Sequence, residues 1–190
     1  MVAGAVDSLV MNRRTLFLGA IAVAVFAAVA FAMWYFAWRP TRFVDHANGF
    51  SIRFTADWDV IGKGEGAHVR ALRTKGPSEG GGTGVISVLM NYIANIPDAA
   101  TYRKWFAENM TSKFPQYARI EDGIRTREGA SVPWSQFVYR SDPGNRPAQV
   151  WQFFYVKESR GYVVTCTATP FDFERFRRDF EEIVDTFQLD

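Results

Sequence analysis

The chain has 190 residues, a formal net charge of +2 and one cysteine, Cys166. With 48% hydrophobic and 16% aromatic residues it can fill a substantial core, and a single cysteine excludes an intramolecular disulfide. Residues 41–190 carry as many basic as acidic side chains, so they lack the basic surface typical of a nucleic-acid-binding protein.

The first predicted element is the uncharged stretch 16–38, which is twenty-three residues long. A helix of this length covers the roughly 30 Å hydrocarbon core of a lipid bilayer. The alternative is a cleaved signal peptide, but the apolar part of such a peptide is only about 7–15 residues long. We therefore predict an N-terminal tail over residues 1–15 and a single transmembrane helix over residues 16–38.

Aromatic and basic side chains stand at the end of the predicted span. The predicted membrane-interface residues are Trp34, Tyr35, Trp38 and Arg39. Tryptophan and tyrosine rings concentrate at membrane–water boundaries. Basic residues are balanced between the two ends of the span, but a short tail that stays inside is the commoner arrangement for a first helix. We therefore expect a single-pass signal-anchor protein of a bacterial inner membrane, with a cytoplasmic N-terminus and a periplasmic C-terminal domain.

Small side chains recur every four residues within the span, at Ala20, Ala24, Ala28 and Ala32. Such a row lets two helix backbones approach closely in lipid, so these alanines are candidates for helix–helix packing with another membrane protein. An alanine-rich composition alone is the alternative explanation.

The rest of the chain is predicted to form a linker over residues 39–48 and one globular domain over residues 49–190. Alternating or continuous apolar runs predict strands at 49–54, 68–73, 85–93, 117–121, 123–127, 132–140, 148–156 and 161–167. One helix is predicted to begin at Asp98, the N-cap, and to end at Phe114. Apolar residues at helical spacing from Phe173 to Phe187 predict a second helix.

These elements predict an α+β fold. Strands that follow one another after short turns pair antiparallel. Both helices must bury an apolar face, and the sheet is the available surface. We therefore expect a largely antiparallel sheet packed with helices, in the form of a sandwich.

The order of these parts resembles the PsbP-like superfamily, which includes the extrinsic protein of the oxygen-evolving complex and the bacterial DcrB-type lipoproteins. The matching stretches are residues 49–52 with Trp58, the helix around 100–105, and residues 161–187. The resemblance implies a compact, usually non-catalytic domain that binds or stabilises other proteins on the outer side of a membrane. Thr55 replaces a proline common in the family, and a predicted transmembrane helix replaces the transit peptide or lipid attachment, so photosystem function is not implied.

No constellation of catalytic, cofactor-binding or metal-ligating residues stands out. His46 and His68 lack the spacing of a metal site. The serines lack the G-x-S-x-G context of a hydrolase, and the glycine clusters at 62–66 and 80–82 match no phosphate-binding loop. We therefore predict a protein that is not an enzyme and that has no cofactor.

Two functions remain. The first is an accessory or assembly subunit of a membrane protein complex, which binds its partners through the extracytoplasmic domain and the transmembrane helix. Its contact residues would include Trp134 and Trp151 if these are exposed. The second is a binding module for a small apolar ligand or lipid, held in an aromatic-lined pocket between helix and sheet; the same aromatic residues could instead fill the core.

Overall fold

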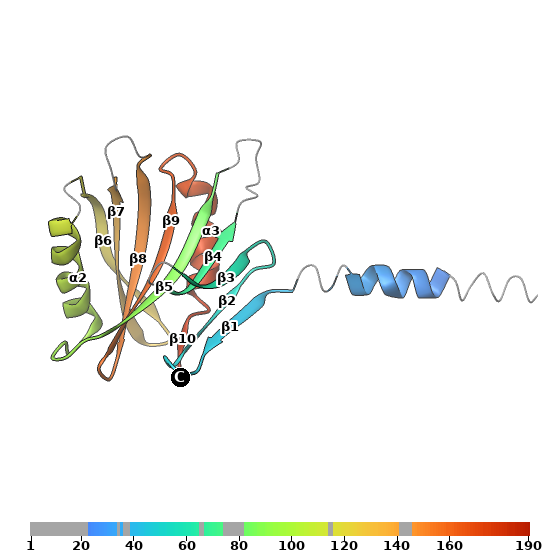
Figure 1. The fold of residues 1–190 in the computed structure, drawn as a ribbon, viewed down its shortest axis with the longest axis horizontal. Helices are drawn as coiled ribbons and strands as arrows, with labels where there is room; N and C mark the ends of the chain where they lie inside the picture. Colours follow the sequence, from blue (N-terminus) through green and yellow to red (C-terminus); the bar gives the residue numbers. More distant parts are fainter. Residues whose placement is uncertain are drawn as a thin grey trace, which may run out of the picture. The chain divides into compact units, whose positions relative to one another are not determined.

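The chain divides into two compact units, residues 1–39 and residues 40–190. The structure, a computed structural model, describes residues 23–33, 35, 39–64, 67–73, 82–113, 116–140 and 146–190. In the first unit, residues 23–33 and 35 are helical. The second unit is largely β, with one helix after β5 (Gly84–Tyr92) and another after β9 (Arg160–Ala168) (Figure 1).

The β-strands and α-helices of the second unit carry the labels of Figure 1. They are β1 (Thr41–Asp45), β2 (Phe50–Phe54), β3 (Asp59–Gly64), β4 (Ala67–Arg73), β5 (Gly84–Tyr92), α2 (Ala99–Lys113), β6 (Ala118–Arg127), β7 (Ala130–Tyr139), β8 (Ala148–Lys157), β9 (Arg160–Ala168), α3 (Phe173–Val184) and β10 (Gln188–Leu189).

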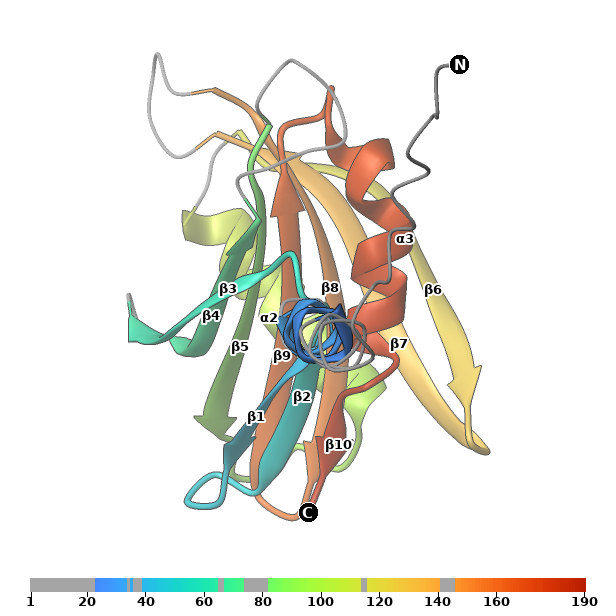
Figure 2. The ribbon, with the colours of Figure 1, turned by 90° about the vertical axis from the view of Figure 1, so that its right-hand side faces the viewer.

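The strands form two antiparallel sheets. The larger sheet has seven strands in the order β3-β4-β5-β9-β8-β7-β6, and the smaller has three in the order β1-β2-β10. Helix α2 packs against β7 and β8, whereas α3 packs against β9, β5 and β2. The two helices therefore cover opposite faces of the large sheet (Figure 2). The predicted α+β fold with antiparallel strands and packed helices is confirmed.

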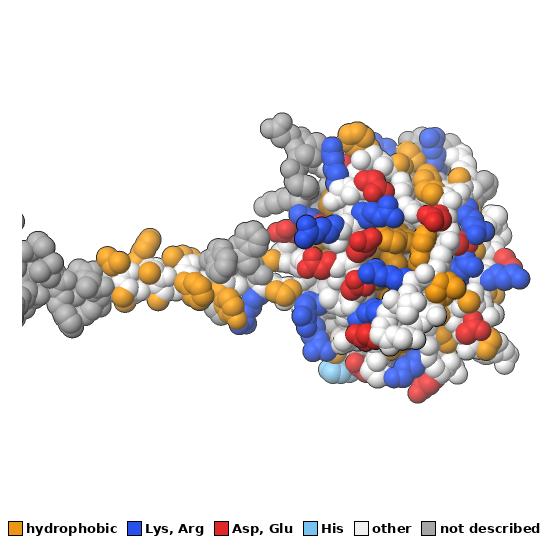
Figure 3. All heavy atoms as spheres, turned by 180° about the vertical axis from the view of Figure 1, so that it is seen from behind, with side chains coloured by type: hydrophobic (Ala, Val, Ile, Leu, Met, Phe, Trp, Pro, Cys, Tyr) orange, Lys and Arg blue, Asp and Glu red, His pale blue; other side chains and the backbone are white. Residues whose placement is uncertain are grey.

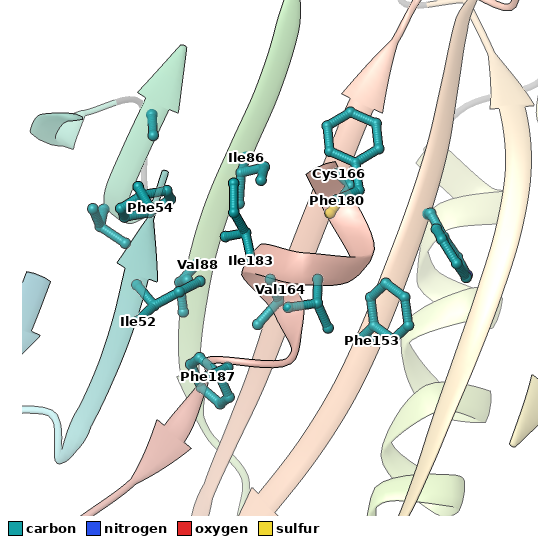
Figure 4. Packing of buried hydrophobic residues seen from close by; sticks show 14 of the residues in the cluster. Ile52, Phe54, Ile86, Val88, Phe153, Val164, Cys166, Phe180, Ile183 and Phe187 are labelled. Atoms are coloured by element: carbon teal, nitrogen blue, oxygen red, sulfur yellow. The ribbon is translucent and has the colours of Figure 1, made fainter. Parts of the chain in front are cut away.

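The larger core lies between α3, the large sheet and β2 (Figure 4). Its α3 side consists of the apolar residues that the helical spacing predicted, and each is at most 2% exposed: Phe173, Phe176, Phe180, Ile183 and Val184. They meet Ile52 and Phe54 of β2 and Val164 of β9. Because each fully buried side chain of this size contributes about 1.5–3 kcal/mol, this row accounts for the docking of α3.

A smaller core lies under α2 and consists of Ile93, Tyr102, Phe154 and Val163. The Tyr102 hydroxyl accepts a hydrogen bond of 2.7 Å from the Asn91 amide. Helix α2 begins as predicted, because Asp98 Oδ1 accepts a 2.8 Å hydrogen bond from the backbone N–H of Thr101. Such a cap satisfies one of the N–H groups that a helix start leaves unpaired.

The structure corrects the predicted elements at β1 and β6, and it adds two strands that were not predicted, β3 and β10. Strand β1 lies inside the range 39–48 that was predicted as a linker, because it pairs with β2 from Thr41↔Phe54 to Asp45↔Phe50. Strand β6 runs from Ala118 to Arg127 with a bulge between Arg119 and Glu121, although two strands were predicted at 117–121 and 123–127. A Cβ at Gly123 would lie 2.5 Å from the Trp134 ring, so the glycine lets that ring cover the strand and does not end it.

Candidate functional site

The structure brings two of the four predicted membrane-interface residues together. The Arg39 guanidinium donates to the Tyr35 hydroxyl at 2.6 Å and lies 4.3 Å from the centroid of the Tyr35 ring. Trp34 and Trp38 lie outside the described residues. The Tyr35–Arg39 pair combines an apolar ring with a charged head, a combination suited to a boundary between apolar and aqueous surroundings.

The helical residues 23–33 expose large apolar side chains. Val23 is 70% exposed, Phe26 is 76% exposed and Met33 is 63% exposed. Of the predicted alanine row, Ala24, Ala28 and Ala32 lie on this helix, whereas Ala20 lies outside the described residues. Within the described part of the chain, no helix combines the length and the apolar character needed to cross a membrane.

The polar cluster around His68 stabilises a turn. The Asn48 amide donates to Asp45 Oδ2 at 2.7 Å and lies 2.9 Å from His68 Nδ1. The backbone oxygen of Asn48 accepts a 2.7 Å hydrogen bond from the Tyr162 hydroxyl. The cluster thus holds the β1–β2 turn against β4 and β9. Among the residues that the structure describes, no group of three or more His, Cys, Asp or Glu side chains could hold a metal ion.

Cys166 lies on β9 in the larger core and is fully buried. Burial raises the pKa of its thiol, because the thiolate would lose its hydration in apolar surroundings. The thiol therefore packs as a small apolar side chain, as the sequence predicted.

Trp134 and Trp151 do not form an exposed contact surface. Trp151 is 5% exposed and Trp134 is partly buried, and their rings meet edge to face at 5.8 Å. The Arg177 guanidinium of α3 covers Trp151 at 5.3 Å. The face of the domain that carries α3 shows acidic and basic side chains interspersed around apolar ones (Figure 3), so no charge of one sign dominates it.

An open cleft of about 440 Å³ lies beside β10 and the β6–β7 turn. Its apolar lining consists of Ala130, Val132, Tyr155, Phe187 and Leu189. Its polar lining consists of Arg127, Glu128, Gln188 and Asp190. The Tyr155 and Phe187 rings lie 4.6 Å apart, and burial raises the pKa of the Tyr155 hydroxyl. The cleft thus offers an apolar floor with charged groups at its edge.

A second, polar hollow of about 240 Å³ adjoins this cleft. It is lined by Arg42, Ser51, Ile52, Arg53, Arg127, Glu128, Asp185, Thr186 and Gln188. Arg127, Glu128 and Gln188 line both spaces. We call the cleft and the hollow together the β10 corner. It is the candidate functional site, because it joins apolar surface to a group of arginines.

Two arginines fix the geometry of the β10 corner. Arg125 pairs with the Asp185 carboxylate at 2.6 Å. Arg127 donates to the backbone oxygen of Phe187 at 2.7 Å and lies 3.5 Å from that of Val184. Carbonyl groups at a helix C-terminus are unpaired and partially negative, so they attract cations. These contacts tie the β6–β7 hairpin to the end of α3.

The other two arginines, Arg42 and Arg53, form no ion pair with any carboxylate that the structure describes. Arg42 donates to Ser51 Oγ at 3.3 Å, and in the described part of the chain it pairs with no carboxylate. The Arg53 side chain forms no hydrogen bond or ion pair with a described residue; its backbone bonds to the Thr186 hydroxyl. Sequence reasoning missed both residues. The available signal was the alternation in residues 50–54 alone, because residues 41–45 have adjacent apolar side chains at Phe43 and Val44 and do not alternate.

The seven-stranded antiparallel sheet between α2 and α3 has the PsbP-like fold, as the resemblance predicted. No protein family matches the sequence, and no curated protein matches it. Among solved structures, the chain is similar to cyanobacterial PsbP from Synechocystis, with 13% identity and a TM-score of 0.53 over 80% of this chain and 92% of that chain.

Two further solved structures have the same architecture. LpqN of Mycobacterium tuberculosis, described as involved in cell envelope biogenesis, has 13% identity and a TM-score of 0.54 over 80% of this chain and 90% of that chain. The Ran-binding protein Mog1p of Saccharomyces cerevisiae has 6% identity and a TM-score of 0.57 over 80% of this chain and 96% of that chain. At identities this low, the structural similarity establishes the fold alone, and any function must be argued from the residues of this chain.

Proposed function

We propose that this chain is a non-catalytic accessory or assembly subunit of a membrane protein complex. A helix over residues 16–38 anchors it, and the PsbP-like domain binds its partners. The observation that carries the proposal is the uncharged run 16–38, whose described helical part 23–33 exposes large apolar side chains. Apolar surface of this extent is covered by lipid or by protein in a working molecule.

The similar folds support the proposal. One of these proteins is described as Ran-binding and another as involved in cell envelope biogenesis. The first of these descriptions is of binding to a partner. For this chain we accordingly propose binding to other proteins rather than chemical turnover.

The proposed topology places the N-terminus in the cytoplasm and the domain outside it, on a bacterial inner membrane. It is tested by fusing alkaline phosphatase, which is active only outside the cytoplasm, or a cytoplasm-dependent fluorescent protein to the C-terminus. We expect strong phosphatase activity and no fluorescence. The opposite pattern would reverse the topology.

Membrane attachment and partnership are tested on the full chain. Membranes are washed with alkaline carbonate, extracted with a mild detergent and separated on a native gel, and the co-migrating proteins are identified by mass spectrometry. We expect the chain to remain in the washed membrane and to migrate with stoichiometric partners. Deletion of residues 16–38 should release it. Migration as a small single species would contradict the accessory role.

The alanine row allows a matched test of helix packing. Replacing Ala24 and Ala28 with leucine enlarges the row, whereas replacing the exposed Val25 and Val29 with leucine enlarges a different side of the helix. We expect only the alanine variant to weaken association with partners. Equal behaviour of the two variants would contradict intramembrane packing along this row.

The β10 corner favours a second function, the binding of a small apolar ligand or lipid. The aromatic residues expected to line a pocket between helix and sheet instead fill the two cores. The cleft beside β10 provides apolar lining at a different place. Native mass spectrometry of the gently purified chain tests this function: a bound ligand is expected, and an unliganded mass with no binding of apolar probes would contradict it.

A further inference from the structure

The register of the small sheet places two positive charges side by side. Arg42 on β1 lies directly opposite Arg53 on β2. Side chains directly opposite each other on antiparallel strands have Cβ atoms roughly 5 Å apart, and like charges there destabilise the sheet. An anion bound between the two guanidinium groups would remove this repulsion.

The charges around the polar hollow do not cancel. Arg125 engages Asp185, and Arg127 engages the backbone oxygens of Val184 and Phe187. Glu128 also lines the hollow, so the two carboxylates Asp185 and Glu128 equal the charges of Arg125 and Arg127 in number. The positive charges of Arg42 and Arg53 remain. Guanidinium groups bind phosphate oxygens through paired hydrogen bonds, so the hollow suits a phosphate.

An apolar cleft adjoins the proposed phosphate position. Arg127 and Gln188 line both spaces, and Phe187 and Leu189 line the cleft beyond them. A free phosphate would use only the polar hollow. A molecule with a phosphate head and an apolar tail would use both, which favours an amphiphile.

We propose that the β10 corner binds one anionic phospholipid, with its phosphate between Arg42 and Arg53 and an acyl chain on the floor of the cleft. Strand β1 begins three residues after the predicted end of the span at Trp38. Three residues extend at most about 11 Å. The choice of the bilayer as the source of the lipid thus rests on the proposed membrane attachment. Anionic lipids attract basic groups near the membrane surface. The strands involved, β1, β2 and β10, lie beside one another in Figure 2.

The proposal is tested with the full chain in an uncharged detergent, by native mass spectrometry during titration with defined probes. The probes are dioctanoyl phosphatidylglycerol, the zwitterionic dioctanoyl phosphatidylcholine and the tail-free glycerol phosphate. We expect saturable binding of one phosphatidylglycerol. Phosphatidylcholine carries the same phosphate but adds a choline cation that the two arginines repel, and glycerol phosphate lacks the acyl chain that would lie in the cleft, so both should bind at least about tenfold more weakly.

The decisive variant is R42Q/R53Q, which removes the opposed charges from exposed positions of the small sheet. It should weaken the binding of phosphatidylglycerol about tenfold or more. The matched control is R140Q/R178Q, which removes the same charge from two other exposed positions of the domain. This control should bind like the unaltered chain. Circular dichroism of both variants verifies that they are folded.

Three results would overturn the proposal. Equal binding of phosphatidylcholine would remove the role of the net negative charge of the head group, and unchanged binding by a folded R42Q/R53Q variant would remove the role of the two arginines. Glycerol phosphate that binds as tightly as the lipid would identify a site for a free anion instead. Membrane attachment is measured separately by carbonate extraction, so a chain that leaves the membrane but binds phosphatidylglycerol through Arg42 and Arg53 would support this site and reject the proposed anchor.

Discussion

Arg127, the last residue of β6, donates to the backbone oxygen of Phe187 at 2.7 Å. The two residues are 60 positions apart in the sequence. Arg127 belongs to the large sheet, and Phe187 directly precedes β10 of the small sheet. The bond joins the β6–β7 hairpin to the chain between α3 and β10. Because no strand ladder connects these parts, the shape of the β10 corner depends on side chains such as Arg127.

Replacing Arg127 with methionine tests this connection. Methionine keeps most of the apolar stem but removes the guanidinium that donates to the Phe187 oxygen, whereas the Val184 oxygen keeps its hydrogen bond of 3.0 Å from the Phe187 backbone N–H. We expect the free energy of unfolding to fall by about 1–3 kcal/mol, measured by urea denaturation of the detergent-solubilised chain. Arg178→Met is the control, since Arg178 is exposed on α3. Equal stability of the two variants would show that the Arg127 bond adds nothing measurable.

Gly123 and Trp134 form a pair that can be tested by a double-mutant cycle. A Cβ at residue 123 would lie within 2.5 Å of the Trp134 ring, so Gly123→Ala should cost about 1–3 kcal/mol of stability. In a Trp134→Leu background the ring is absent, and the same alanine should cost much less. The interaction energy of the cycle is expected to be about 1 kcal/mol or more. Additive effects would mean that the ring does not constrain residue 123.

The elements that the sequence predicted well are those whose signal is local. Helix α3 is predicted by Phe173, Phe176 and Phe180 on one face, and the start of α2 is predicted by the Asp98 cap. Each pattern fits within a few turns of helix and needs no information about the rest of the fold. The antiparallel pairing of β6 to β9 followed because these strands are separated by short turns, whereas the pairing of the non-consecutive strands β5 and β9 was not predicted.

The β10 corner could not be predicted in the same way. It combines residues near 42–53, 125–132 and 185–190 with Tyr155, and β10 itself has only two residues. A two-residue strand has no detectable periodicity. Strand β1, with the sequence TRFVD, follows Pro40 and has adjacent apolar residues at Phe43 and Val44, so it does not alternate either. The site therefore arises from long-range pairing, which a single sequence does not encode in any local pattern.

Asp98 gives the stability of the domain a pH dependence. Hydrogen bonds from the Thr101 backbone to its carboxylate lower the pKa of Asp98. A lowered pKa in the folded state means that the stabilisation is present above the unfolded pKa, about 3.9, and is lost as the pH falls through the folded value. Asp98→Asn keeps a capping oxygen without the titration. We expect unfolding curves from about pH 6 to pH 2 to show a smaller acid-induced loss in Asp98→Asn than in the unaltered chain. Identical pH profiles would contradict a stabilising carboxylate at this cap.

Cys166 reports on opening of the larger core. Burial raises the pKa of its thiol above the ordinary value, so at pH 8 the folded protein presents almost no thiolate, the form that reacts. We expect a thiol-specific disulfide reagent to label the native chain very slowly and to label one thiol per chain at once in concentrated guanidinium chloride. A Cys166→Ala chain with Thr126→Cys, at an exposed position of β6, is the matched control and should react rapidly without denaturant. Labelling of native Cys166 at the rate of that control would show that β9 and α3 separate readily, contrary to the packing described for them.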